Sequence, residues 1–299
     1  MIIIQVMGGL GNQLQQYALY RKFVRMGKEA RLDISWFSDK EKRGEVLAER
    51  ELELDYFDRL VYETCTPEEK AQLIGSEGAA GKLKRKLLPG RIRWFHESKI
   101  YHPELLQMEN MYLSGYFACE KYYADILYDL REKIQFPKSS NPENIKMAQE
   151  MQERESVSVH LRRGDYLDEK NTAMFGNICT DAYYRKAIEY VKILCSNPHF
   201  YIFSDDIPYV RQRFTGEEYT VVDINHGRDS FFDMWLMSRC RHNICANSTF
   251  SFWGARLNSN DNKIMIRPTI HKNSQVFVKE EMEQLWPGWK FISPDGGIK

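Results

Sequence analysis

Short apolar runs alternate with amphipathic segments along most of the chain. Ile2 to Met7 is a compact apolar run that suits a buried strand, and the segment after it carries Leu14, Tyr17 and Val24 on one helical face. The second half repeats this alternation, with strands predicted at 156–161, 199–203, 219–224, 242–246 and, as the last one, 263–268. Short connections between strands and helices indicate a parallel, doubly wound sheet. The pattern predicts an α/β protein with two such halves.

Signals at helix ends help to divide the chain into domains. Thr66-Pro67-Glu68-Glu69 offers a capping threonine, a first-turn proline and a reciprocal glutamate. Pro137 ends an aromatic-rich helix, and the polar stretch 138–144 is the best linker. At 299 residues the chain exceeds one average domain. We therefore predict an N-terminal domain of residues 1–145 and a C-terminal domain of residues 146–299.

Composition and charge exclude several functional classes. Lysine and arginine together number 42, as do aspartate and glutamate, so the formal net charge of zero argues against a nucleic-acid binder. Hydrophobic residues at 43% suffice for packed cores. No apolar run approaches the roughly 18 residues of a membrane span, and the N-terminus lacks a basic leader. We expect a soluble, cytoplasmic protein.

The six cysteines contain no C-x-x-C pair. Cys240 and Cys245 flank a predicted strand, and His242 lies between them. A zinc site at this position would need a second pair of ligands, which the sequence does not offer. Buried free thiols are the favoured interpretation, and no metal is expected.

A glycine-rich loop, G-G-L-G-N-Q at 8–13, follows the first strand. A strand, a glycine loop and a helix bring backbone N–H groups to an anion, here at Gly9 and Gly11. The spacing is not G-x-G-x-x-G, and no acidic residue holds a persuasive ribose position, so a dinucleotide site is weakly supported. The alternative is that the glycines only make a tight turn.

The strand at 156–161 leads into a loop rich in charged residues. His160, Arg162, Arg163 and Asp165 lie within six positions. In an open parallel sheet, ligands bind beyond the carboxyl ends of the strands, where this loop lies. Guanidinium groups match the oxygens of phosphate or carboxylate. The alternative is an arginine–aspartate surface pair at a strand end.

Two further strand ends carry polar side chains. Asp205 and Asp206 suit a divalent metal bound through a diphosphate, the N–H edge of a purine, or the cap of the next helix. With two arginines nearby for a diphosphate, a metal is not required. The loop 247–251 offers groups that either hold a phosphate or only cap a helix: Asn247, Ser248, Thr249 and Ser251.

The segment Lys82 to Arg93 is basic, with leucines and Trp94 interleaved and no acidic residue between Glu77 and Glu97. Such a segment suits peripheral contact with an anionic membrane surface, here the inner face of the cell membrane. The alternative is a solvated helix face.

Five segments in the right order resemble the α-1,2-fucosyltransferases across nearly the whole chain. They are G-G-L-G-N-Q at 8–13, L-S-G-Y-F at 113–117, H-L-R-R-G-D-Y at 160–166, F-S-D-D at 203–206 and D-M-W-L-M-S-R-C-R-H-N-I-C-A-N-S-T-F-S-F-W-G-A at 233–255. The H-x-R-R-G-D loop is also similar to loops of α-1,6- and protein O-fucosyltransferases. Between 38 and 110, only L-E-L-D-Y-F at 52–57 is similar.

The resemblance implies an inverting glycosyltransferase of the GT-B type, in which two Rossmann-like domains face a cleft. It implies transfer of L-fucose from GDP-L-fucose to the 2-hydroxyl of a terminal β-galactoside, on an oligosaccharide or glycolipid, without a metal or another cofactor. The N-terminal domain is then the acceptor side, and the C-terminal domain binds GDP-fucose. Without the membrane anchor of animal members, the chain looks like a bacterial enzyme of surface-polysaccharide synthesis. Another linkage, or a non-catalytic glycan-binding protein, is the alternative.

The resemblance also implies roles for the donor loops. Arg162 would neutralise the diphosphate, and His160 with Asp205 or Asp206 would face the guanine or the ribose. Hydroxyl groups of the third loop would hold phosphate oxygens, at Ser248, Thr249 and Ser251.

The remaining roles are less constrained. Asn12 would lie near the fucose or the leaving oxygen, as in protein O-fucosyltransferases. Arg163 points away from its neighbour at the strand end and would brace the loop through Asp165. A carboxylate has to take the proton of the attacking hydroxyl, and Asp165, Asp168 and Glu169 all remain open for this role.

Overall fold

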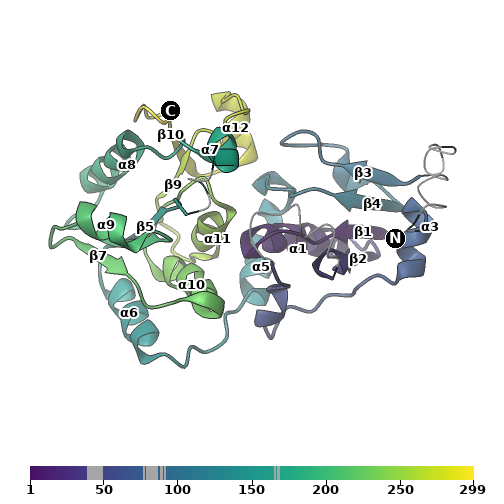
Figure 1. Cartoon of the computed structure of the whole chain (residues 1–299), viewed down its shortest axis with the longest axis horizontal. Coiled ribbons are helices and arrows are strands. Elements are labelled where there is room, and N and C mark those ends of the chain that lie inside the picture. Colours follow the sequence, from purple (N-terminus) through teal and green to yellow (C-terminus); the bar gives the residue numbers. More distant parts are fainter. Residues whose placement is uncertain are drawn as a thin grey trace. The chain divides into compact units, whose positions relative to one another are not determined.

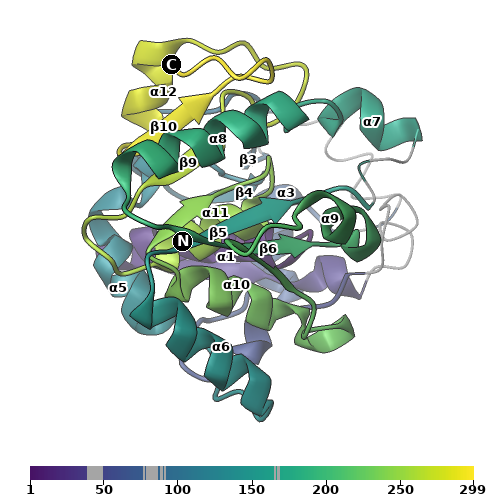
Figure 2. The ribbon, with the colours of Figure 1, turned by 90° about the vertical axis from the view of Figure 1, so that its left-hand side faces the viewer.

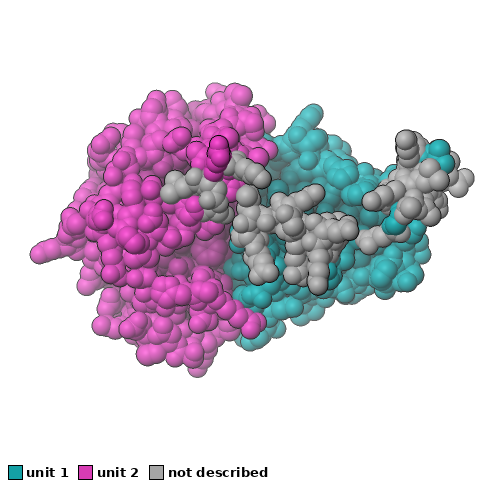
Figure 3. Space-filling view, viewed as in Figure 1, with its two compact units in different colours: residues 1–135 teal, residues 136–299 magenta. Residues whose placement is uncertain are grey.

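The computed structural model of this chain describes residues 1–38, 50–76, 78, 87, 90, 92–164, 166 and 169–299 (Figure 1). The chain forms two compact units, Met1–Gln135 and Phe136–Lys299, which Figure 3 colours teal and magenta. Each unit contains a parallel sheet. The prediction of an α/β protein with two parallel-sheet halves is confirmed.

The boundary between the units lies earlier than residue 145, where the sequence analysis placed it. Helix α6 (Pro142–Glu153) belongs wholly to the second unit, because it packs on β5 (Ser156–Leu161) and α10 (Phe231–Arg239) of that unit. The ring of Phe136 stacks on that of Phe231, with centroids 6.2 Å apart. The predicted linker therefore runs along the second unit rather than between the two.

In the first unit, four strands pair in the order β2-β1-β4-β3, and all neighbouring pairs are parallel. The strands are β1 (Ile2–Gln5), β2 (Ala30–Asp33), β3 (Trp94–His96) and β4 (Met111–Ser114). The helices are α1 (Leu10–Arg25), α3 (Pro67–Ile74) and α5 (Leu127–Lys133). Helix α1 packs on β1 and β2, and Leu14 and Tyr17 of this helix are fully buried. The capping box predicted at Thr66 is confirmed, since Thr66 and Glu69 exchange both of its hydrogen bonds.

In the second unit, six strands pair in the order β10-β9-β8-β5-β6-β7, again all parallel. They are β5 (Ser156–Leu161), β6 (His199–Ser204), β7 (Tyr219–Val222), β8 (His242–Ile244), β9 (Met265–Pro268) and β10 (Trp289–Ile292). The helices are α6, α7 (Glu169–Phe175), α8 (Asp181–Leu194), α9 (Ile207–Arg213), α10 (Phe231–Arg239), α11 (Thr249–Leu257) and α12 (Lys279–Leu285). The predicted last strand at 263–268 is therefore followed by one more.

Helices cover both faces of this second sheet. Figure 2 shows α8 on one side of the strands and α6 with α10 on the other. Val157, Val159 and Leu161 of β5 point toward α8, where they join one apolar cluster. On the other face, Tyr201 and Phe203 of β6 pack with α6 and α10. The period-two alternation of each strand thus builds a core on both faces.

A buried ion pair in the first unit joins Asp33, the last residue of β2, to Lys70 of α3. The Lys70 ammonium lies 3.0 Å from Asp33 Oδ2, and the two side chains are 8% and 3% exposed. Tyr112 donates a hydrogen bond to Asp33 at 2.6 Å, and the Ser35 backbone N–H donates another. Burial by itself would raise the pKa of Asp33. The hydrogen bonds from Tyr112 and Ser35 and the charge of Lys70 outweigh it and hold that pKa below its usual value.

We expect Lys70→Met to lower the free energy of unfolding by about 3–5 kcal/mol at pH 7, because it leaves a buried carboxylate without its cation. A carboxyl with a lowered folded pKa stabilises the protein above its unfolded pKa and loses that effect as the pH falls. Losing Lys70 raises the pKa of Asp33. The difference in the free energy of unfolding between wild type and Lys70→Met should therefore become smaller as the pH approaches 4. Urea unfolding at both pH values measures it.

The double variant Asp33→Asn/Lys70→Met is the control, because it removes the buried charge together with its partner. At pH 7, the double variant should regain much of the free energy of unfolding that Lys70→Met loses. Equal costs for Lys70→Met in the wild-type and Asp33→Asn backgrounds would contradict a role for this pair.

Candidate active site

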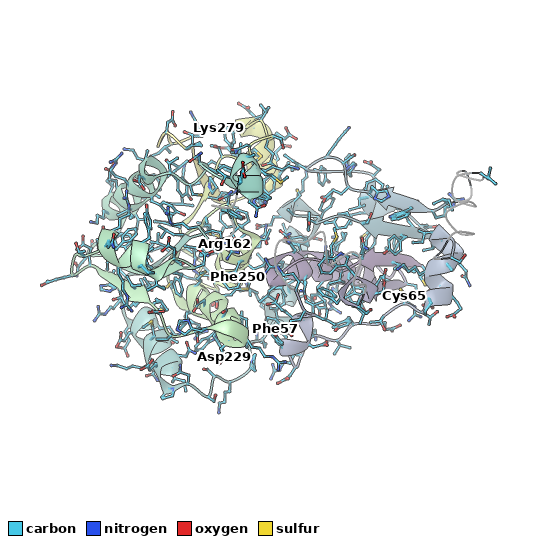
Figure 4. The ribbon with its side chains drawn as sticks, viewed as in Figure 1. Phe57, Cys65, Arg162, Asp229, Phe250 and Lys279 are labelled. Carbon is cyan, nitrogen blue, oxygen red and sulfur yellow. The ribbon has the colours of Figure 1, made fainter. Side chains whose placement is uncertain are left out.

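Three strand ends meet at one edge of the second sheet. Strand β5 lies between β8 and β6, and Leu161 of β5 is opposite Ser204 of β6. The loops that follow these strands therefore begin side by side. The structure brings together the three predicted segments 160–164, 204–206 and 247–251; Arg162 and Phe250, which mark two of them, are labelled in Figure 4.

Two arginine–aspartate pairs link the first two loops. Arg162 Nη1 lies 2.9 Å from Asp205 Oδ2, and Arg163 Nε lies 3.0 Å from Asp206 Oδ2. The Arg163 backbone N–H also donates to Asp205 at 2.8 Å. The guanidinium of Arg163 stacks 3.6 Å above the ring of Tyr209. Both arginines are thus held at this edge, in an orientation set by the aspartates.

Asp206 braces Arg163 in the structure. The predicted brace through Asp165 stays a prediction, because Asp165 lies outside the described residues, as does Asp168. Asp206 also caps α9 by accepting the Tyr209 N–H at 3.2 Å, which was one of the three predicted uses of the aspartate pair. The hydrogen bond from Arg163 is the main reason why the pKa of Asp206 is lowered.

His160 is a buried polar residue beside the arginines. Its side chain is 7% exposed, and its Nδ1 finds no hydrogen-bond partner among the described residues. Burial lowers its pKa to about 4, with Arg162 acting in the same direction and Asp205 against it. The imidazole is therefore neutral at pH 7. A buried polar atom without a partner costs about 1–3 kcal/mol, so His160 Nδ1 is a natural contact for a ligand.

In the third loop, residues 247–251, two side chains hold the backbone by hydrogen bonds and two others are half-buried. Asn247 is almost fully buried, and its Nδ2 donates to the carbonyls of Phe175 and His271, both at 3.1 Å. Buried Ser251 donates to the Ser248 carbonyl at 3.2 Å. Ser248 is the N-cap of α11, but its side chain makes no capping hydrogen bond in the described structure. Asn247 and Ser251 therefore shape the loop, while Ser248 and Thr249 lie half-buried at the helix start.

Two tyrosines of this edge were missed by sequence reasoning. The Tyr166 hydroxyl donates to the Asn247 carbonyl at 3.0 Å, and its ring lies 5.8 Å from the Arg162 guanidinium. Tyr209 supports Arg163 from α9. Tyr166 stands within the H-L-R-R-G-D-Y segment, which was a usable signal, whereas no pattern in the sequence marks Tyr209.

The glycine loop of the first unit contains Gly8 at φ +80°, a backbone conformation that favours glycine. A Cβ on Gly8 would lie 2.7 Å from Asn12 Nδ2, and one on Gly9 would lie 3.3 Å from Arg50 Nη1. Burial raises the pKa of Glu53 to about 7, and the Leu10 N–H at the start of α1 opposes this rise. The donor contacts predicted for Gly9, Gly11 and Asn12 stay predictions.

Among the described residues, one group of three could hold a metal ion: Glu155, Cys195 and His242, at the amino-terminal edge of the second sheet. His242 Nδ1 accepts the Ile264 N–H at 3.0 Å, so the neutral ring carries its proton on Nε2. That nitrogen lies 2.6 Å from Glu155 Oε1. Since a metal needs the lone pair of Nε2, this arrangement fits a hydrogen-bonded clamp better than a metal site.

Other predictions concern cysteines and membranes. All six cysteines are free, and burial raises the pKa of the Cys245 thiol to about 12. No described helix is long and apolar enough to cross a membrane. Most of the basic segment Lys82 to Arg93 falls outside the described residues, so membrane contact there stays a prediction.

The family model described as Glycosyl transferase family 11 matches residues 98–293. The chain belongs to glycosyltransferase family 11. The resemblance to α-1,2-fucosyltransferases is confirmed at the level of the family.

Three relatives show how far the likeness extends. The O-antigen biosynthesis glycosyltransferase WbnK of Escherichia coli is 29% identical over 288 residues, covering 87% of this chain and 91% of the relative. An α-1,2-colitosyltransferase of Escherichia coli is 27% identical over 303 residues and 96% of both chains. A galactoside α-(1,2)-fucosyltransferase 1 of Leontopithecus chrysomelas is 27% identical over 141 residues, or 46% of this chain and 39% of that one.

Solved structures of similar fold have low sequence identity. NodZ α-1,6-fucosyltransferase, soaked with GDP-fucose, has a TM-score of 0.49 at 15% identity, covering 86% of this chain and 92% of that one. The ADP-heptose LPS heptosyltransferase II of E. coli has a TM-score of 0.42 at 12% identity, covering 97% and 89%.

We expect Gly164→Ala to disturb the ion pair of Arg162, because the new Cβ would lie 2.7 Å from Asp205 Oδ2. Asp205 is held by Arg162 and by the Arg163 N–H, so it cannot move freely. The free energy of unfolding should fall by about 1–3 kcal/mol, and by much less in an Asp205→Ala background. Urea unfolding of wild type, Gly164→Ala, Asp205→Ala and the double variant measures the coupling between the two positions.

Gly216→Ala is the matched control in the same unit. Its Cβ would also meet a carboxylate, that of Glu218, but this longer and more exposed side chain can move aside. The free energy of unfolding of Gly216→Ala should stay within about 0.5 kcal/mol of the wild-type value. An equal loss for Gly164→Ala with and without Asp205 would show that the clash is elsewhere.

Proposed function

We propose that this protein transfers L-fucose from GDP-L-fucose to the 2-hydroxyl of a terminal β-galactoside, with inversion and without a metal. Membership of glycosyltransferase family 11 supports glycosyl transfer. The relatives named as α-1,2-colitosyltransferase and galactoside α-(1,2)-fucosyltransferase support the linkage. The relative named for O-antigen biosynthesis supports a place in surface-polysaccharide synthesis.

The observation that carries the proposal is the group formed by Arg162, His160 and the start of α11. Arg162 supplies a fixed cation, and neutral His160 offers a buried nitrogen without a partner in the described chain. The first N–H groups of α11 follow Ser248, whose side chain makes no cap there. A cation beside a helix start favours a diphosphate, and an uncharged ring nitrogen favours a hydroxyl or an N–H of the nucleoside.

The proposed chemistry assigns Arg162 to the leaving group. As the bond between the fucose C1 and the phosphate oxygen breaks, negative charge grows on the β-phosphate of GDP. A guanidinium has five N–H donors, so Arg162 can keep Asp205 on Nη1 and still turn donors toward phosphate oxygens. A fixed donor of this kind stabilises the transition state by about 2.7–4 kcal/mol.

The aspartates support a reaction without a metal. Asp205 and Asp206 each pair with an arginine at about hydrogen-bond distance. A divalent ion at these carboxylates would compete with two guanidinium groups that already supply positive charge. The arginines thus offer the neutralisation that a metal provides in other nucleotide-sugar enzymes.

A colitosyl donor is the second candidate. The colitosyltransferase aligns with 96% of this chain, whereas the galactoside fucosyltransferase aligns with 46%. Colitose is fucose without its 3-hydroxyl, so the two donors differ by one hydrogen-bonding group. A site that bonds this hydroxyl rejects the deoxy sugar by roughly 10⁴-fold, and a site that does not discriminates weakly. The ratio of the rates measured with GDP-fucose and with GDP-colitose therefore shows which donor the site prefers.

We expect wild-type protein in EDTA to release GDP from GDP-fucose when lactose is present. Arg162→Ala should lower kcat about 100- to 1,000-fold, because the leaving group loses its cation. GDP release measures turnover, and NMR of the product reads the linkage. The same assay with GDP-colitose decides the donor.

The control is Arg211→Ala, which removes an exposed arginine paired with Asp223 at 2.7 Å in the same unit. It should keep the wild-type rate. If wild type turns over neither donor and calorimetry detects no binding of GDP, the donor assignment is wrong. If GDP-fucose binds but no acceptor reacts, a glycan-binding protein becomes the better reading.

A further inference from the structure

One tyrosine of the second unit connects the first loop of the site, after β5, with the third. Tyr166 follows Arg162 by four residues, and its hydroxyl donates to the Asn247 carbonyl at 3.0 Å. Its ring centroid lies 5.8 Å from Arg162 Cζ, within the range of a cation–π contact. The side chain of Tyr166 therefore reaches both the loop that carries Arg162 and the loop that leads into α11.

Three contacts among Tyr166, Phe175 and Asn247 form a closed set. The rings of Tyr166 and Phe175 stack, with their centroids 5.1 Å apart and their planes inclined by 17°. The Phe175 carbonyl accepts a hydrogen bond from Asn247 Nδ2 at 3.1 Å, and the Asn247 carbonyl accepts one from the Tyr166 hydroxyl. Each residue contacts the other two, so a shift of any one of them breaks at least one contact.

The carboxyl end of α7, on which Tyr166 packs, is fastened by a further loop. Asn273 Nδ2 donates to the carbonyls of Ala173 and Gly176 at 3.0 and 3.2 Å. The Thr172 hydroxyl donates to the Tyr166 carbonyl at 2.9 Å. Tyr166 is therefore held through its backbone, its ring and its hydroxyl, and it packs on a helix end that is itself fixed.

We propose that Tyr166 is a positioning residue of the donor site and fixes the spacing between Arg162 and the start of α11. This inference rests on the proposed function, in which these two groups hold the diphosphate of the donor. Asp205 orients Arg162 from the second loop, and Tyr166 adds the contact with the third. A charge-assisted hydrogen bond needs about 2.7–2.9 Å between its heavy atoms, so both groups can bind one diphosphate only when their spacing is correct.

The hydroxyl of Tyr166 carries the argument, because the ring contact with Phe175 would serve packing alone. A phenylalanine would stack on Phe175 equally well but could not bond to the Asn247 carbonyl. That carbonyl belongs to the peptide group whose N–H is that of Ser248, the N-cap of α11. The hydroxyl therefore acts on the orientation of the backbone at the helix start, where the phosphate is expected.

Tyr166→Phe tests the proposal, because it removes the hydroxyl and keeps the ring on Phe175. We expect the affinity for GDP, measured by calorimetry, to fall about 3- to 10-fold, since the two phosphate-binding groups lose their pre-organised spacing. The affinity for GMP should change less than about two-fold, because GMP lacks the second phosphate. The kcat for the preferred donor should fall about 10- to 100-fold.

A double-mutant cycle with Arg162→Ala separates positioning from a general loss of structure. In the Arg162→Ala background, Tyr166→Phe should change the affinity for GDP less than about two-fold, since there is no guanidinium left to position. A residue that only stabilises the fold would cost the same factor in both backgrounds. Tyr166→Leu, which also removes the ring beside Arg162, should weaken GDP binding more than Tyr166→Phe does.

Tyr219→Phe and Tyr219→Leu are the matched controls in the same unit. Tyr219 is half-buried at the amino-terminal end of β7, and its ring centroid lies 5.7 Å from Lys192 Nζ and 5.6 Å from that of Phe200. These variants lose the same chemical groups at the opposite edge of the sheet. They should bind GDP and GMP with the wild-type affinities, whatever they cost in the free energy of unfolding.

The outcomes separate this role from the proposed function. If wild type binds GDP and Tyr166→Phe binds it equally well, or loses affinity for GDP and GMP by the same factor, the role of Tyr166 is overturned and the transferase stands. Equal losses in the wild-type and Arg162→Ala backgrounds overturn it as well. A wild type that binds neither GDP nor GMP overturns the proposed function and the role of Tyr166 together. Because Tyr166→Phe keeps the ring, its result decides even if Tyr166→Leu fails to fold.

Discussion

The second unit depends on the register between two neighbouring parallel strands. Because Leu161 of β5 lies opposite Ser204 of β6, the chain leaves both strands side by side, and each arginine after β5 meets an aspartate after β6. A shift of one residue would turn every side chain of β5 to the other face. It would take Val159 out of the core against α8 and put His160 into it. The apolar core therefore fixes the register, and the register fixes the charged pairs.

A buried arginine, Arg267, packs against the helix that follows the third loop. Arg267 of β9 is 1% exposed and packs between the rings of Phe252 and Trp286, with its Cζ 4.4 and 4.3 Å from their centroids. A guanidinium is weakly hydrated and stacks on aromatic faces, so it tolerates this site better than an ammonium would. Burial first, and then this charge, lowers the pKa of His271, whose carbonyl holds Asn247. A loop with a cation behind it and Arg162 beside it suits an anionic ligand.

Local patterns were enough to predict most strands, several caps and the polar strand ends. Thr66 and Pro67 marked a helix start because capping depends only on neighbours in the chain. Strand β10 was missed, since W-K-F-I is short and gains its place only by pairing with β9. Asp206, the partner of Arg163, lies 43 residues away in the sequence, and no local pattern predicts such a pair. Gln13 Oε1 accepts the N–H of Glu53, 40 residues away, and no local pattern encodes this contact.

Two carboxyl groups of the first unit have different surroundings. Gln5 of β1 pairs with Asp33 of β2, so the glycine loop and Asp33 leave the sheet at the same edge. Asp33 receives a cation and two hydrogen-bond donors, and this keeps it ionised and ties α3 to the sheet. Glu53 is half-buried, and burial raises its pKa to about 7. Environment alone thus gives two carboxyl groups of one unit different proton affinities.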